Sequence, residues 1–426
     1  MTLFSVFWLT TIFYCFTRKS IREMTLITLI YMTFQCTNVI QFGEVGIGPQ
    51  VLTSLVYIAK YVVDSKGHIK LMKKREFYIL DVLLLVLLLD IIVSSVVNGT
   101  ILNVAFKILQ LLSYIMCYWC MRRALCQMSD EEIYHLVKKV IVFVVTVGLL
   151  QWVVTMVLPF LRPLLKIIFF NENSTNIYFN YTDVNHNKRI YAMFMEPSYL
   201  ACFLVGGFYY LLSFREKWKK NIGLMILILF EIIFTTSSTA YGAFAIVGLL
   251  FILQSKQIPR VWRVMIFCLG IISILILYFG FYGLLDAVLF SKASTGSGIT
   301  RARWNREAYL AYQSSPIFGV GYKNVRGSSI YYSLLGELGI IGVITYISFL
   351  LVSVYKVVFK NKIVITSNTG YFGAIYAVIA AAICQFIACP DLDMCSLWLM
   401  LYILAIYEGK YMQHLKENRK VNKDGK

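Results

Sequence analysis

Long apolar segments alternate with short polar connections along almost the whole chain. A helix needs about 20 apolar residues to cross a bilayer, and segments of roughly that length recur from residue 2 to residue 409. These segments are 2–17, 23–42, 46–64, 77–97, 101–121, 139–160, 198–214, 221–236, 239–254, 264–284, 339–358, 369–388 and 394–409. The pattern predicts an all-α, polytopic integral membrane protein with about 12 to 13 transmembrane helices.

Composition excludes a soluble enzyme and a disordered chain. Of the 426 residues, 59% are hydrophobic and only 15% are charged, whereas soluble domains carry roughly 25% charged residues. A soluble fold of this length has too little interior to remove so much apolar surface from water.

The basic residues predict the orientation of the chain. There are 40 Lys and Arg against 22 Asp and Glu, a net charge of +18. Such an excess in a soluble protein would indicate nucleic-acid binding, but cytoplasmic loops of membrane proteins are also rich in Lys and Arg. Most of the basic residues lie in alternate connections, at 18–22, 66–75, 122–139, 215–220, 256–263, 356–362 and 410–426. We therefore predict an outer N-terminus, a cytoplasmic C-terminus and no nucleic-acid partner.

Two long connections depart from this alternation, because they are expected on the outer face and yet carry ten basic residues. Long loops in compact proteins are usually functional. They divide the chain into an N-terminal bundle (1–160), a first outer loop (161–197), central helices (198–284), a second outer loop (285–338), C-terminal helices (339–409) and a basic cytoplasmic tail (410–426).

The second outer loop contains an arginine-rich stretch, 301–312, of helical composition. Arg303 and Arg306 share a helix face, and Arg301 lies at the expected N-terminal end. Guanidinium groups near a helix N-terminus are suited to hold a pyrophosphate. The alternative is an amphipathic helix on the membrane surface whose arginines face lipid phosphates.

Glycines follow this stretch at two places. Gly319 and Gly321 give backbone freedom to a turn after Pro316, and Glu337 lies in the sequence Gly-Glu-Leu-Gly that opens the next membrane helix. A carboxylate at that position stabilises the positive end of a helix.

The first outer loop ends in a helix-start motif. Pro197 suits a first helical turn, so Glu196-Pro197-Ser198 predicts the beginning of a membrane helix. Glu196 has two interpretations, stabilisation of the helix dipole or service as a general base at the membrane surface. Arg189, seven residues upstream, is a candidate partner for Glu196 or for phosphate.

Few ionisable residues lie inside the apolar segments, and such residues are functional candidates by default. Asp81 and Lys107 lie near segment ends, whereas Asp90 and Glu231 lie deeper and are the best support for a transporter. Histidines are scattered through the chain, so we predict no metal site and no cofactor. They are His68, His135, His186 and His414.

Five stretches of the sequence together resemble the O-antigen polymerase and ligase superfamily of bacterial membrane glycosyltransferases. The resemblance is carried by motifs between about residues 190 and 345, around a long outer loop. The matching stretches are 194–201, 235–240, 301–304, 315–322 and 334–342.

The resemblance implies a fold of the GT-C type and metal-independent, inverting transfer of glycans from undecaprenyl diphosphate at the outer face of the cytoplasmic membrane. It implies diphosphate binding by Arg301 and Arg303, with Arg189 and Arg306 next, and a catalytic role for Glu196. The implied partners are a lipid-linked oligosaccharide donor and acceptor and the bilayer, with a chain-length regulator and a flippase as further candidates.

One departure separates two members of that superfamily. Ligases carry a histidine shortly before the Glu-x-Gly-x-x-Gly stretch, and no histidine occurs here between residues 187 and 413. The expectation is therefore a polymerase that builds a capsular, exopolysaccharide or O-antigen chain. A ligase-type transferase and, from a different class, a lipid-linked-oligosaccharide flippase or transporter remain the alternatives.

Overall fold

Helices make up nearly all of the described chain. The structure, a computed structural model, describes residues 3–42, 45–65, 79–161, 163, 189–254, 261, 264–265, 296–358 and 369–424. The helices are α1 (Leu3–Arg18), α2 (Ile21–Tyr31), α3 (Pro49–Asp64), α4 (Ile79–Val97), α5 (Ile101–Ala124), α6 (Asp130–Trp152), α9 (Pro197–Ser213), α10 (Trp218–Phe234), α11 (Ser238–Gln254), α14 (Gly296–Ser314), α15 (Ile330–Val358), α17 (Thr369–Ala388) and α18 (Cys395–Asp424).

Several of these helices are long and apolar enough to cross a membrane. Within the described residues, five meet this test: α4, α5, α6 with the π-helical turn η2 (Val153–Val157), the part of α15 from Ile330 to Val352, and α17. A sixth is added if α9 and the following segment Arg215–Phe234, which meet at 95°, form one broken span. The chain is therefore a multi-pass membrane protein. Each expected apolar segment in the described ranges contains a helix, but several are shorter than 18 residues, and 264–284 lies almost wholly outside those ranges.

One expected span is not a continuous helix. α2 ends at Tyr31, so its 11 residues reach only about 16 Å, and a two-stranded antiparallel hairpin follows, with β1 (Ile40–Phe42) paired to β2 (Val45–Ile47). The segment 23–42 contains polar residues at 33, 35 and 38 that a lipid-facing helix would leave without partners. Here the backbone N–H of Gln35 donates to the carbonyl of Met193 at 2.9 Å. The described residues are thus consistent with the all-α prediction, and the small hairpin is the one local departure in this segment.

α9 lies at the centre of the bundle, and almost every residue from Pro197 to Ser213 is buried. It packs against α17, α10, α11 and α18. Small residues allow the close approach to α17: a Cβ atom at Gly206 would lie 3.2 Å from the carbonyl oxygen of Ala377. Close packing of small residues is the usual way in which helices associate where lipid, not water, is the solvent.

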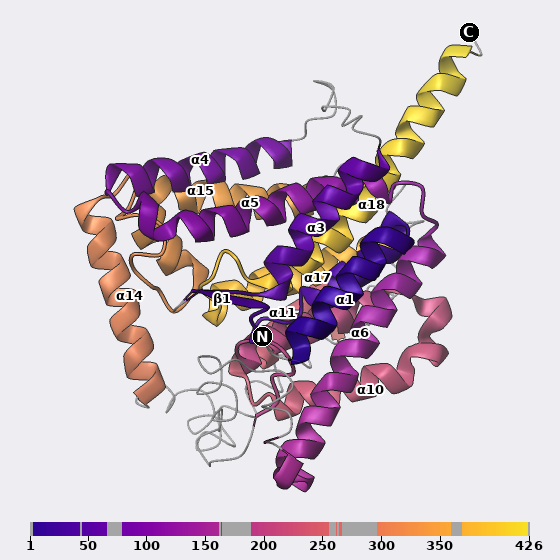
Figure 1. Cartoon of the computed structure of the whole chain (residues 1–426), viewed down its shortest axis with the longest axis horizontal. Helices are drawn as coiled ribbons and strands as arrows, with labels where there is room; N and C mark the ends of the chain where they lie inside the picture. The colour runs from indigo at the N-terminus through magenta and orange to yellow at the C-terminus, as the bar shows by residue number, and fades with distance from the viewer. Residues whose placement is uncertain are drawn as a thin grey trace.

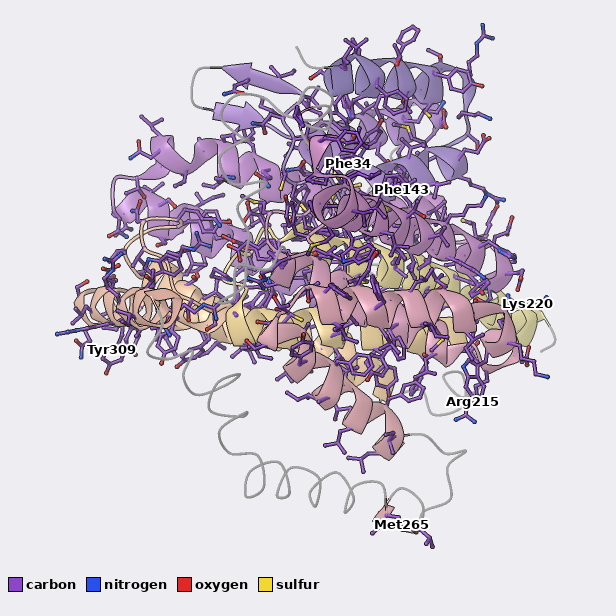
Figure 2. The ribbon with its side chains drawn as sticks, turned by 90° about the horizontal axis from the view of Figure 1, so that it is seen from below. Phe34, Phe143, Arg215, Lys220, Met265 and Tyr309 are labelled. Atoms are coloured by element: carbon purple, nitrogen blue, oxygen red, sulfur yellow. The ribbon has the colours of Figure 1, made fainter. Side chains whose placement is uncertain are left out.

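The polar connections gather at two opposite ends of the bundle. At one end, which we call the basic face (18–22, 122–132, 215–220 and 408–410), Lys410 pairs with Asp130 at 2.7 Å and Arg22 with Glu132 at 3.7 Å. The other end, the site face, consists of 98–100, 189–197, 315–329 and 389–394. Figure 2 shows Tyr309 of α14 at one end and Arg215 and Lys220 at the other. In Figure 1, α14 stands across the ends of α4 and α15, and α18 points away on the opposite side. Connections that the charge pattern assigns to one side of the membrane therefore lie together.

A buried ion pair joins α4 and α5 near the basic face. Arg122 is 4% exposed and donates to both carboxylate oxygens of Asp81, at 2.9 and 2.8 Å, and Asp81 also accepts from the indole N–H of Trp119. The Arg122 guanidinium lies over the ring of Tyr118, whose hydroxyl donates to Glu408 of α18. Asp81, a functional candidate from the sequence, is thus part of a structural cluster.

We expect Arg122→Ala to lower the free energy of unfolding by about 3–5 kcal/mol, because the variant leaves the buried Asp81 carboxylate without its cation. The matched control is Arg303→Ala, which removes an exposed pair with Glu307 at 3.6 Å and is expected to change stability by less than about 1 kcal/mol. Thermal unfolding in detergent measures both. Equal losses in the two variants would contradict a stabilising role for the Asp81–Arg122 pair.

Candidate functional site

Glu196 occupies the N-cap of α9 at the site face, as the Glu-Pro-Ser motif predicts. Its backbone is extended (φ −142°, ψ 153°), and Pro197 is the first helical residue. The Ser198 hydroxyl donates to one carboxylate oxygen at 3.2 Å, and Nη2 of Arg326 lies 4.0 Å from the other. The side chain is 37% exposed, so the carboxylate is positioned by its neighbours and still accessible.

The glycines at 319 and 321 shape a tight turn that rests on α15. Gly319 (φ +63°) and Gly321 (φ +101°) both adopt the left-handed region. The N–H of Gly321 donates to the carbonyl of Glu337 at 3.0 Å, and Ser94 of α4 donates to the same carbonyl at 2.9 Å. A Cβ atom at Gly319 would lie 2.3 Å from the carbonyl carbon of Glu337. The two glycine motifs of the sequence are therefore one packing unit.

Glu337 lies just before a break within α15. It lies in the last turn of a first helical part of α15, which begins at Ile330, and the second part opens after Gly339, as the Gly-Glu-Leu-Gly sequence predicts. A break at Gly339 (φ +66°) follows, and the N–H of Ile340 beyond the break donates to the carbonyl of Pro316 at 2.9 Å. The buried Glu337 thus precedes an internal break in α15 and supports the 316–321 turn through its backbone.

Lys323 connects this turn to the α17–α18 connection. Its backbone is left-handed (φ +59°), and its ammonium lies 2.6 Å from Asp391 and 3.0 Å from Asp393. Burial tends to lower the pKa of the Lys323 ammonium, but the two carboxylates raise it well above its ordinary value. Burial raises and Lys323 lowers the pKa of Asp391, which falls to about 2. Both groups are therefore charged at neutral pH.

The start of α9 and the N-terminal half of α5 reach the same cluster. The hydroxyl of Tyr199, three residues after Glu196, donates to the second carboxylate oxygen of Asp391. Lys107 of α5 lies 3.7 Å from Asp393. Three separate parts of the chain thus form a row of alternating charges, and α9 adds a neutral hydroxyl group to it.

Arg326 is held between α9 and α14. Its guanidinium carbon lies 4.9 Å from the ring centroid of Trp304 on α14, a cation–π contact. The neighbouring Asn305 side chain accepts a 2.8 Å hydrogen bond from the backbone N–H of Ser328, which fixes the 324–329 segment against α14. Arg326 therefore presents a positioned guanidinium beside Glu196.

The arginines predicted to bind diphosphate lie on the exposed part of α14. α14 begins at Gly296, five residues before Arg301, so the small-residue stretch before the arginines is also helical. The expected placement at a helix N-terminus is thus wrong. Arg301, Arg303 and Arg306 are all exposed, in the same helix as Trp304.

Arg189 lies at the end of α10. Its Nε donates to the backbone carbonyl of Thr235 at 2.8 Å, and the next residue, Ile190, donates its N–H to the carbonyl of Phe234 at 3.2 Å. Of the predicted residues, the structure brings Glu196, Pro197 and Ser198 to Arg326, and it places Gly319, Gly321 and Glu337 in the supporting turn.

The sequence did not single out four charged residues of this site, namely Lys323, Arg326, Asp391 and Asp393. Arg326 is one of several basic residues in the second outer loop, and Asp391 and Asp393 lie in a short connection that has no Lys or Arg. Two aspartates in a connection without basic residues indicate that a cation from another part of the chain pairs with them. The partner, Lys323, is 68 residues away in sequence, and only tertiary structure identifies it.

The site is equipped to bind an anion beside an accessible carboxylate. Guanidinium groups bind diphosphate through paired hydrogen bonds, and an aromatic ring such as Trp304 offers an apolar face. Among the residues that the structure describes, no group of three metal-ligating side chains occurs. Neither protein-family models nor curated protein sequences match this chain.

We expect Gly319→Ala to destabilise the protein, because alanine there combines left-handed strain of about 1–2 kcal/mol with a backbone clash. Two controls separate these causes. Gly99 shares the positive φ (+66°), but a Cβ atom would meet nothing within 4 Å, and Gly223 in α10 has neither the strain nor a neighbour. The expected order of thermal stability is Gly223→Ala, then Gly99→Ala, then Gly319→Ala. A Gly319→Ala variant as stable as Gly99→Ala would show that the turn does not rest on α15.

Proposed function

We propose that the chain is a polysaccharide polymerase that joins undecaprenyl-diphosphate-linked oligosaccharide repeat units at the outer face of the bacterial cytoplasmic membrane. The product is a capsular, exopolysaccharide or O-antigen chain. The observation that carries the proposal is the Glu196–Arg326 contact beside Trp304, at the end of the bundle where the two long outer loops meet.

In this proposal, Arg326 binds the diphosphate of the donor. Charge develops on the diphosphate as its bond to the sugar breaks, and a fixed guanidinium stabilises that charge without a metal. Arg301, Arg303 and Arg306, exposed on α14, add further cationic groups that attract the lipid-linked diphosphate. Arg189 is the outlying member of this set.

Glu196 is the proposed general base. The acceptor hydroxyl transfers its proton to the Glu196 carboxylate, and its oxygen bonds to the anomeric carbon of the donor sugar. The bond from that carbon to the diphosphate oxygen breaks, and undecaprenyl diphosphate leaves. Attack opposite the leaving group inverts the anomeric centre. This geometry requires base and cation on opposite sides of the reacting carbon, so the proposal requires the 4.0 Å separation of Glu196 and Arg326 to widen on substrate binding.

Buried carboxylates favour a second candidate from a different class. Asp90 of α4 and Glu231 of α10 are buried in the spans, and their carboxylate oxygens have no hydrogen-bond partner among the described residues. Membrane-embedded acids of this kind are typical of transporters, so a lipid-linked-oligosaccharide flippase is the alternative. A ligase has less support, because its histidine has no counterpart between residues 187 and 413.

We expect Arg326→Ala to slow polymer formation by about 10²–10³-fold, because it removes charge stabilisation of the leaving group. Arg326→Lys should restore little, since an ammonium does not reproduce the planar guanidinium. Glu196→Gln should lose about 10²–10⁴-fold as a general base is removed. The measurement uses purified protein in lipid with undecaprenyl-diphosphate-linked repeat units, and the products are resolved by size on a gel.

The matched control is Arg215→Ala on the basic face, which should give the wild-type ladder. A normal ladder from Arg326→Ala and Glu196→Gln would contradict the assignment of this site. Repeat units that cross the bilayer without growing would replace the polymerase by a flippase.

A further inference from the structure

A carboxyl group is enclosed between α6 and α10. Glu231 is 0% exposed, and its neighbours Ile228 and Ile232 on α10 are buried as well. The absence of a side chain at Gly148 of α6 makes the space for it, since a Cβ atom there would lie 2.5 Å from Oε1 of Glu231. Neither oxygen accepts a hydrogen bond of good geometry from the described residues. The N–H of Leu149 approaches the carboxyl group, but in the middle of a helix it is already used by the helix itself.

Two further polar groups on the same stretch of α6 lack a partner. The side-chain N–H groups of Gln151 and Trp152 are buried and have no acceptor among the described residues. The Trp152 ring contacts Phe230 and Phe234, which flank Glu231, at centroid distances of 5.4 and 5.7 Å. Positions three and four residues after Gly148 lie on the same helix face, so these donors belong to the face of α6 on which Gly148 meets Glu231. An acid and two donors thus lie at one interface, none of them paired.

Charges that would stabilise an ionised Glu231 are scarce around it. α6 carries no acidic or basic residue from 140 to 152, and α9, which also packs against α10, carries none from 197 to 213. The segment 189–192, which follows the end of α10, contributes two titratable groups, Arg189 and the phenol of Tyr191. The guanidinium of Arg189 donates to the carbonyl of Thr235. An ionised carboxylate without a partner costs several kcal/mol or more in such surroundings, and the group becomes neutral instead.

We propose that the α6–α10 interface is a proton-binding site, in which Glu231 is a neutral carboxylic acid and the N–H groups of Gln151 and Trp152 are the donors that receive the carboxylate when the proton leaves. Its ligand is the proton, and it is separate from the Glu196–Arg326 site. Gln151 links the two, because its side-chain oxygen accepts from the backbone N–H groups of Tyr191 and Ala192, at 3.0 and 2.8 Å, in the segment that leads to Glu196.

Infrared difference spectroscopy of the full-length protein in lipid at neutral pH tests this site without any assay of activity. Subtracting the Glu231→Gln spectrum from that of the wild type should show the loss of one C=O stretching band of a protonated carboxylic acid. The matched control, Glu131→Gln on the basic face, removes a 59% exposed carboxylate that pairs with Lys217. It should show the loss of carboxylate bands only. Loss of carboxylate bands from Glu231→Gln would overturn the proposal.

A second measurement uses the wild-type protein, so it does not depend on the folding of a variant. An apolar carbodiimide reacts with protonated carboxyl groups in apolar surroundings: the acid proton moves to a carbodiimide nitrogen, and the carboxyl oxygen bonds to the central carbon. Mass spectrometry should find at least tenfold more adduct on Glu231 than on Glu131 at neutral pH. Equal labelling, or labelling of Glu131 alone, would contradict a protonated Glu231.

Discussion

The pairing of Lys323 with Asp391 and Asp393 is the interaction on which the site face depends. Lys323 adopts a left-handed backbone conformation, which is strained for a residue other than glycine. Its ion pairs with the two aspartates stabilise this conformation. Its ammonium ties the turn after α14 to the α17–α18 connection, and Tyr199 ties the start of α9 to the same aspartate. These contacts position Arg326, three residues after Lys323, beside Glu196.

The membrane explains why charges occur where they do. In lipid every polar group needs an internal partner, so charged residues within or beside the spans either form pairs, as Asp81 and Arg122 do, or carry a proton, as we propose for Glu231. Apolar burial does little to join helices in this solvent. Close contacts of small residues, such as Gly206 against Ala377, and paired charges at the helix ends take its place.

Local features were predictable from the sequence, and tertiary ones were not. Pro197 correctly predicted the start of α9, because proline is favoured at the first helical position. The end of α2 at Tyr31 was missed, because apolar residues continue to position 42 and the partners of Gln35 lie in the distant segment 193–195.

The site itself shows the same division. The arginines of α14 and the Glu196 motif stood out because their residue types and spacing are local properties. Asp391 and Asp393 did not, because their partner lies in another part of the chain, and the helical start at Gly296 was hidden by residues with low helix propensity. Arg326 could be chosen from the other basic residues of its loop only when Trp304 and Glu196 were seen on either side of it.

The most direct measurement of the account is equilibrium binding of undecaprenyl diphosphate to the purified protein in lipid nanodiscs. In the proposed mechanism, Arg326 binds the diphosphate and Glu196 binds the acceptor hydroxyl. This mechanism therefore predicts binding at least tenfold weaker for Arg326→Ala, a difference of about 1.4 kcal/mol, and wild-type binding for Glu196→Gln. Wild-type affinity in Arg326→Ala would contradict it.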